Sequence, residues 1–305
     1  MAQVYKESGR LGNSLVVIPM ISIPAITVMG FIYGYIDVYN PAEKIAVLLP
    51  FGYGALAGWC VQRAAIRGKC RSRLVLGGLA TLAGLLALYV AWVVFIYALL
   101  QRFQTTPGPS LYNIIVAPDL LWRIINRVNQ SGWFSTSGST PTGWELWSFW
   151  IGEAITIVGF TTIFPLWTFN RVFCEDCNHW CQEHKDLARF KDKLDSTQSA
   201  RLKGGDLKVL ADIPTTTRGV YPFLRLDSQR CHGCNNTATF QVSRVTGLKN
   251  KNGKITDSAK VLTKNYLLTS TDLQEFQEAL AKTALAQVES QNPPQNSAPE
   301  EPTSA

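Results

Sequence analysis

The sequence predicts an α-helical transmembrane bundle of four spans followed by a small α+β domain outside the lipid. Of its 305 residues, 47% are hydrophobic and only 17% are charged, which is too apolar for an ordinary pair of soluble domains. Residues 1–173 carry twelve Lys and Arg against six Asp and Glu, whereas residues 174–305 carry seventeen against sixteen. The basic excess therefore belongs to the membrane part. The nearly neutral second part argues against a nucleic-acid partner.

Four stretches with at most one charge are the predicted spans. They are residues 15–36, 45–61, 74–100 and 146–169. A helix rises about 1.5 Å per residue and needs roughly 20 apolar residues to cross about 30 Å of hydrocarbon, so each stretch is close to that length or longer. The first is longer than the apolar core of a secretory signal, and we interpret it as a retained helix.

Basic residues in the short loops predict the orientation. The connection 62–73 contains five basic residues and no acid, and positively charged loops stay on the cytoplasmic side. We therefore expect residues 1–13 and the chain after 173 to be cytoplasmic, and residues 101–145 to lie outside. Trp144, Trp147 and Trp150 stand where the last span would enter from outside, at headgroup depth. We therefore expect a multi-pass protein of a bacterial inner membrane.

The outer segment 101–145 contains a predicted amphipathic helix at 119–131. Its apolar residues recur at helical spacing, at Leu120, Leu121, Ile124, Ile125 and Val128. Gly132 is placed to end the helix. We expect the helix to lie on the outer membrane surface or over the bundle, with 132–143 as a flexible connection.

Small residues and prolines predict features of the bundle. The second and third predicted spans each have a face of small residues, which predicts close helix contact. The residues are Gly52, Gly54 and Gly58 in the second span, and Gly77, Ala80, Gly84 and Ala87 in the third. Prolines remove backbone hydrogen bonds and predict kinks, at Pro19 and Pro24 in the first span and Pro50 in the second.

Glu153 lies inside the fourth predicted span and is the predicted intramembrane polar site. An ionisable group inside a span is costly and indicates function or a specific hydrogen bond. Two interpretations stay open: hydrogen bonding to a neighbouring Tyr or Thr, and a role with an ion, proton or ligand.

Two C-x-x-C pairs are the strongest chemical signal: Cys174 with Cys177, and Cys231 with Cys234. Each pair can place two thiolates on one metal, and together they complete the tetrahedral four-sulfur shell that structural Zn²⁺ accepts. The pattern resembles the zinc-ribbon modules, in which two such turns meet and β-strands follow. The resemblance covers only the cysteines and their flanks, and it implies a structural zinc. The 53 residues between the pairs exceed the insert of the compact pattern.

Cys181 and His184 offer substitute ligands, because they extend the first pair to C-x-x-C-x-x-x-C-x-x-H. A redox-active C-x-x-C is a further possibility. A reducing cytoplasm disfavours structural disulfides. The expected cytoplasmic position of the cysteines therefore agrees with a metal site.

Residues 174–288 are expected to form the zinc-ribbon-like domain. Leu187, Phe190 and Leu194 recur at i, i+3 and i+7, which predicts a short helix. Strands are predicted at 220–226, 237–245 and 255–268, with a hairpin turn at 252–253.

A last helix is predicted near the end of this domain. Thr271 and Gln274 form its predicted capping box, and Leu273, Phe276 and Leu280 its apolar face. Residues 289–305 are expected to be disordered.

No nucleotide-binding or hydrolase motif is present, and the three histidines lie in or near the cysteine turns. Catalysis is therefore not favoured, although it stays open. We expect a membrane-anchored scaffold whose cytoplasmic domain binds a protein partner, with a homo-oligomer also possible. The alternatives are a small transporter or channel component that uses Glu153, and a membrane-bound thiol oxidoreductase that uses Cys231 and Cys234.

Overall fold

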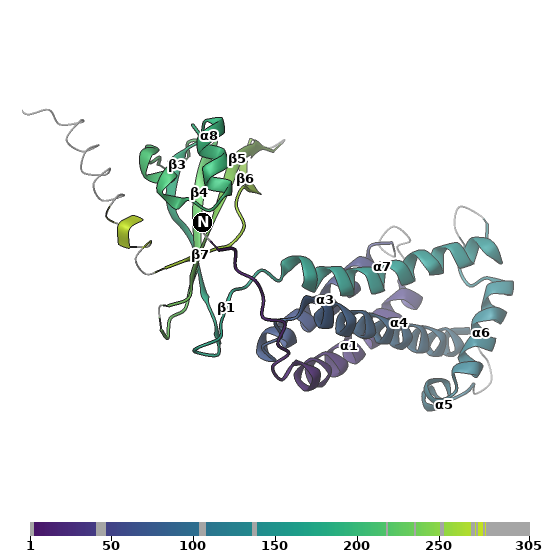
Figure 1. Ribbon diagram of the computed structural model, residues 1–305. Coiled ribbons are helices and arrows are strands. Elements are labelled where there is room, and N and C mark those ends of the chain that lie inside the picture. Colours follow the sequence, from purple (N-terminus) through teal and green to yellow (C-terminus); the bar gives the residue numbers. More distant parts are fainter. Residues whose placement is uncertain are drawn as a thin grey trace, which may run out of the picture. The chain divides into compact units, whose positions relative to one another are not determined.

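The computed structural model describes residues 3–40, 47–103, 108–135, 139–217, 219–234, 236–250, 253–269, 272, 274–276 and 278. It consists of two compact units (Figure 1). The helical unit is Ser8–Asn170, and the sheet unit combines Met1–Glu7 with Arg171–Ala305. The start of the chain joins the sheet unit because Val4 bridges to Tyr266 and the Leu267 amide donates to the Gln3 carbonyl at 2.8 Å.

Four long helices form the helical unit: α1 (Ser14–Tyr39), α3 (Leu49–Arg67), α4 (Arg73–Phe103) and α7 (Trp144–Thr168). α1 packs against α3 and α4, and α7 packs against the same two helices. In the most apolar stretch of α4, 50% of the residues are buried, against 22% in α1 and in α7. α4 is therefore the most enclosed of these three helices.

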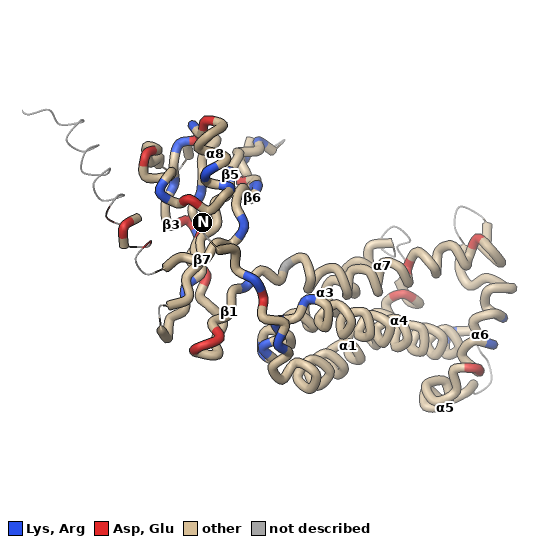
Figure 2. Tube along the Cα trace, in the orientation of Figure 1, with Lys and Arg blue, Asp and Glu red and all other residues tan. Residues whose placement is uncertain are grey.

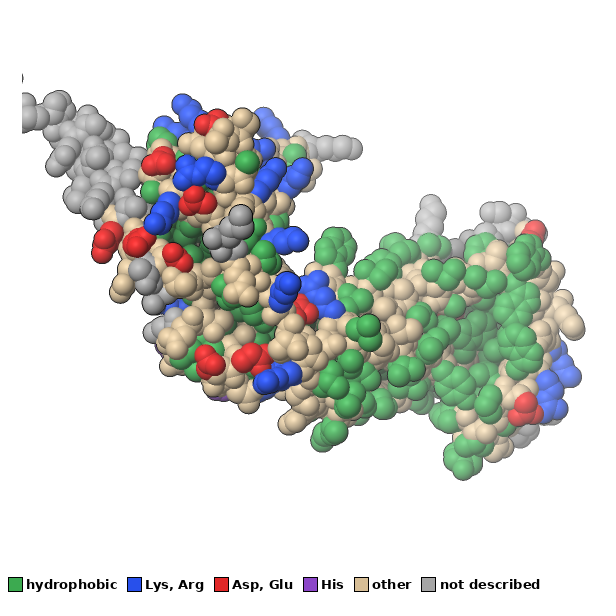
Figure 3. Space-filling view, in the orientation of Figure 1, with side chains coloured by type: hydrophobic (Ala, Val, Ile, Leu, Met, Phe, Trp, Pro, Cys, Tyr) green, Lys and Arg blue, Asp and Glu red, His purple; other side chains and the backbone are tan. Residues whose placement is uncertain are grey.

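Three of these helices, α1, α4 and α7, are long and apolar enough to cross a membrane. Large apolar side chains cover much of the visible surface of the helical unit (Figure 3), and most of its Lys and Arg residues lie toward its two ends (Figure 2). α3 is not among the three, although it has 19 residues. Its glycines, Gln62 and Arg63 lower its mean hydropathy.

Glycines on α3 and α4 permit close backbone approach to α7, as the small-residue pattern of the second and third predicted spans indicates. A Cβ on Gly54 of α3 would lie 2.9 Å from the Ile157 carbonyl oxygen of α7. A Cβ on Gly58 would lie 3.0 Å from the Phe160 carbonyl oxygen. A Cβ on Gly52 would meet no described atom within 4 Å, so the place of Gly52 in the predicted contact face is wrong.

The predicted kink at Pro50 is also wrong. α3 begins at Leu49, which puts Pro50 in the first turn, where no backbone hydrogen bond is lost. Pro19 and Pro24 do lie inside α1.

A helix, α6 (Pro118–Ser131), stands where the sequence predicts an amphipathic helix, and it follows the short α5 (Leu111–Val116). Leu121 and Ile125 are buried in one cluster with Leu99 and Trp150 of the long helices, so α6 docks over the bundle. Gly132 ends α6 with φ 72°. Part of the predicted flexible connection, 136–138, lies outside the described residues.

The sheet unit contains an antiparallel sheet with strand order β3-β4-β5-β6, and β7 pairs with β5. The strands are β3 (Gln182–Lys191), β4 (Phe223–Arg230), β5 (Ala238–Lys249), β6 (Ile255–Val261) and β7 (Tyr266–Leu268). Its apolar core joins one face of the sheet to α8 (Ser196–Lys203) and a 3-10 helix, η1 (Leu207–Asp212). A separate hairpin pairs β1 (Phe173–Cys174) with β2 (His179–Trp180).

The predicted helix at 187–194 is wrong, because most of this segment belongs to β3. Phe190 pairs with Leu224 of β4 and is fully buried, whereas Leu187 is 56% exposed. The strand register shifts between His184 and Ala188, and Asp186 has φ 62°. This irregularity interrupts the two-residue alternation, so the apolar residues imitate helical spacing.

The predicted strands exist with shifted ends, and the return segment is divided into β6 and β7. At the C-terminal end, the Asp272 amide donates to Thr269 Oγ1 at 3.1 Å, and the Thr269 amide donates to Asp272 Oδ2 at 3.2 Å. This reciprocal pair is formed two residues before the predicted capping box. Phe276 is buried. Thr271, Leu273, Leu280 and residues 289–305 lie outside the described residues.

Candidate metal centre

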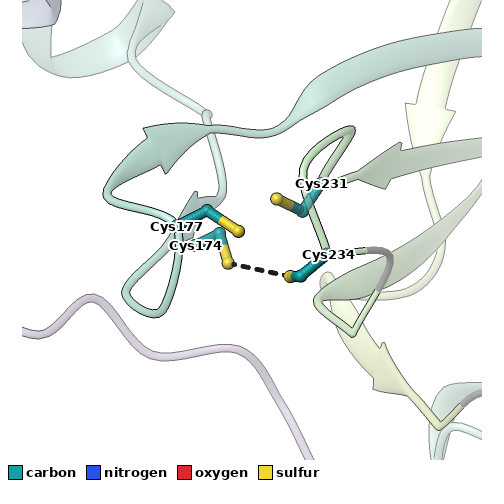
Figure 4. Close-up of side chains that lie close together, drawn as sticks. All are labelled: Cys174, Cys177, Cys231 and Cys234. Atoms are coloured by element: carbon teal, nitrogen blue, oxygen red, sulfur yellow. Dashed lines mark hydrogen bonds between the residues drawn. The ribbon is translucent and has the colours of Figure 1, made fainter.

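Four cysteine side chains from two hairpin turns point toward one another (Figure 4). Cys174 ends β1, and Cys177 lies in the turn that leads to β2. Cys231 and Cys234 lie in the turn between β4 and β5. Residues almost 60 positions apart in sequence therefore meet at a single point.

Short-range hydrogen bonding shapes both turns. In the first, Cys174 pairs with His179 across β1 and β2, and Asn178 takes the left-handed conformation at φ 55°, which asparagine tolerates. In the second, the Cys231 amide donates to the Thr237 carbonyl at 2.8 Å and closes the turn.

The four sulfur atoms lie at the spacing of a tetrahedral metal shell. All are within 4.8 Å of one another, and Cys174 Sγ is 3.5 Å from Cys234 Sγ. Zinc–sulfur bonds of about 2.3 Å in a tetrahedron separate the sulfurs by about 3.8 Å, a value inside this range. The four cysteines can hold a metal ion.

Hydrogen bonds prepare part of the cluster for thiolates. Thr237 Oγ1 donates to Cys174 Sγ at 3.3 Å. The pKa of Cys231 is lowered to about 7, chiefly because the backbone N–H groups of Cys234 and Gly233 donate to its sulfur. The pKa of Cys177 is raised to about 12, chiefly by its hydrogen bond with the Cys234 sulfur, and burial raises the pKa of Cys174. A cation would reverse these increases, because it stabilises every thiolate.

The group of four candidate ligands does not include Cys181 or His184. Cys181 is buried against the cluster, where its amide donates to the Val172 carbonyl and burial raises the pKa of its thiol to about 12. His184 is exposed on β3, opposite Ser228. The structure therefore brings together the two C-x-x-C pairs and not the set that includes Cys181 and His184.

Glu153 of α7 accepts a hydrogen bond of 2.6 Å from the Tyr33 hydroxyl of α1. It also lines a small cavity in the helical unit, together with Asp37, Ala91, Trp92, Phe95 and Trp150. The sequence analysis missed Asp37 because the predicted first span ends at residue 36, whereas α1 continues to Tyr39. A second carboxylate thus shares the cavity with Glu153.

No protein-family model, curated protein or solved structure matches the chain. Its own features define its class. The chain combines three helices that are apolar enough to cross a membrane with a four-cysteine cluster that can hold a metal.

Proposed function

We propose that the chain is a membrane-anchored scaffold whose sheet unit folds around one structural Zn²⁺ and binds a protein partner. The cluster of four thiolate donors carries this proposal. Four sulfurs saturate a tetrahedral zinc and leave no position for a substrate, so the ion has a structural role.

The cluster also explains why the sheet unit needs a metal. Two of its cysteines, Cys174 and Cys231, form a small buried group with Val172 and Cys181. This group is separate from the main apolar core. One metal ion would join the β1–β2 hairpin to the β4–β5 turn and supply folding free energy that these few side chains do not. This arrangement supports a zinc-ribbon-like assignment for the unit.

In the proposed topology α3 is the fourth span. Its 19 residues extend about 28 Å, close to the thickness of the hydrocarbon layer. The basic connection between α3 and α4 favours a cytoplasmic position for the start of α1 and for the sheet unit. The proposed membrane is a bacterial inner membrane, whose cytoplasmic side keeps thiols reduced.

A double substitution of Cys231 and Cys234 by Ser tests the scaffold proposal. We expect the purified variant to lose its zinc, measured by elemental analysis, and its sheet unit to become sensitive to limited proteolysis. Cys181→Ser is the matched control, because it removes a buried thiol beside the cluster and should keep the metal. A metal-free protein with a protease-resistant sheet unit would contradict the proposal.

A transporter or channel component is the second candidate function. The cavity shared by Glu153 and Asp37 favours it, since paired carboxylates within a bundle of apolar helices are costly and typical of ion or proton pathways. Glu153→Gln in reconstituted vesicles is the test, with Glu145→Gln as the control. Proton or cation flux that depends on Glu153 alone would support this function. The absence of flux in the wild type and both variants would exclude it.

A thiol oxidoreductase is the third candidate, and the lowered pKa of Cys231 favours it. Rapid alkylation of one cysteine in metal-replete protein would support this activity. Protection of all four cysteines by zinc would support the scaffold.

A further inference from the structure

β6 (Ile255–Val261) is the outer strand of the main sheet. Among the described residues, nothing pairs with β6 on the side away from β5. All seven residues of β6 are exposed, and its register with β5 is continuous over seven pairs. The free edge therefore presents a regular row of backbone donors and acceptors.

Part of this edge belongs to a ribbon that extends beyond the rest of the sheet. β4 pairs with β5 only as far as Val245, whereas β6 follows β5 to Lys249. Tyr221 supports the ribbon, because its ring packs where a Cβ on Gly247 would lie 3.0 Å away. The Tyr221 hydroxyl also donates to the Asp257 carboxylate. A two-stranded ribbon is marginally stable alone, so this support holds the edge in place.

The segment around β6 carries more basic than acidic residues. Four exposed lysines lie on or beside β6: Lys260 in the strand, Lys254 and Lys264 outside its two ends, and Lys249 on the paired strand β5. None of them forms an ion pair within the described part of the chain. The single acid between Thr246 and Thr269 is Asp257, which binds Tyr221.

Several basic residues elsewhere in the sheet unit have acidic partners. Such pairs are Arg189 with Asp186, Arg225 with Asp227, and Arg244 with Asp192. Unlike these arginines, the lysines around β6 leave their charge available to a partner.

We propose that the free edge of β6 binds an extended acidic segment of a partner protein as an added strand. This inference rests on the proposed scaffold function and names the surface and the chemistry of the partner. Lysines on an edge strand disfavour pairing with a second copy of the same edge, because like charges would meet. They favour a segment rich in Asp and Glu.

The register with β5 places the exposed side chains of Ile255 and Val261 on one face and that of Lys260 on the other. A segment that alternates apolar and acidic residues matches this pattern. Backbone hydrogen bonds provide affinity, and the lysines select the charge.

The test uses the full-length protein in nanodiscs of zwitterionic lipid and a fluorescent nine-residue peptide in which Glu alternates with Val. We expect saturable binding that weakens as salt increases. Lys254→Glu with Lys260→Glu should weaken binding by roughly tenfold or more. The control pair Lys193→Glu with Lys203→Glu makes the same charge change at exposed positions away from β6 and should change the dissociation constant by less than about twofold.

A second peptide with Pro in place of the central Val separates strand addition from simple charge attraction. Because Pro cannot donate a backbone hydrogen bond, we expect this peptide to lose binding. Equal binding of both peptides, equal losses in both double variants, or no binding by the wild type would overturn the edge site. Zinc content measured on each variant distinguishes the scaffold proposal from the edge site. A protein that retains zinc and does not bind the peptide contradicts the edge site alone.

Discussion

Gly233 lies so close to Cys177 that a Cβ at position 233 would be 3.0 Å from the Cys177 sulfur. The same Cβ would be 3.9 Å from the Cys231 sulfur. The two cysteine turns therefore approach each other so closely that a methyl group at position 233 fits only if the Cys177 sulfur moves.

Gly233→Ala should weaken zinc binding by roughly tenfold, because crowding in a packed site costs about 1–3 kcal/mol. A chelator competition assay measures the loss. His232→Ala is the control, since the exposed His232 is in the same turn and its truncation creates no clash. Unchanged affinity in Gly233→Ala would show that the turns are farther apart than in the structure.

Zinc affinity should fall steeply as pH falls. The pKa values of Cys174 and Cys177 are raised in the absence of metal, so both thiols are protonated near neutral pH. Zinc binds thiolates and must displace these protons, and lower pH favours the competing protons. At least two displaced protons predict a change of at least about 100-fold per pH unit. Titrations at pH 6, 7 and 8, with proton release measured in two buffers, test this, and a pH-independent affinity would contradict thiolate ligation.

Gly54→Val should destabilise the helical unit, whereas Gly52→Val should not. A Cβ at Gly54 meets the backbone of α7, whereas a Cβ at Gly52 meets no atom of the described residues within 4 Å. We expect Gly54→Val to lower stability by about 1–3 kcal/mol, as overpacking does. Thermal unfolding in detergent, followed by tryptophan fluorescence, compares the two variants. Equal effects would mean that α3 does not contact α7 through this face.

Phe190→Ala and Leu187→Ala distinguish the observed strand from the helix that the sequence pattern predicts. Phe190 is fully buried, and its truncation should cost about 3–5 kcal/mol. Leu187 is 56% exposed, and its truncation should cost less than about 1 kcal/mol. Denaturant unfolding of metal-loaded protein measures both. Similar losses at the two positions would favour the helix.

The sequence alone determined the features that depend on local composition and spacing. Long apolar stretches with at most one charge indicated α1, α4 and α7, since a membrane requires a minimum length of apolar helix. The 3.6-residue period indicated α6, and the C-x-x-C spacing indicated the two turns that supply sulfurs, because two residues between cysteines fit one tight turn.

Only the tertiary structure decided which distant groups meet. It selected Cys174, Cys177, Cys231 and Cys234 over the set that contains Cys181 and His184, because the pairing of β3 with β4 brings the two turns together. It brought Asp37 to the cavity of Glu153, and it turned the segment around Phe190 into a strand through pairing with β4. The physical reason is common to all three: pairing and packing between distant segments outweigh local preference, and no local pattern contains that information.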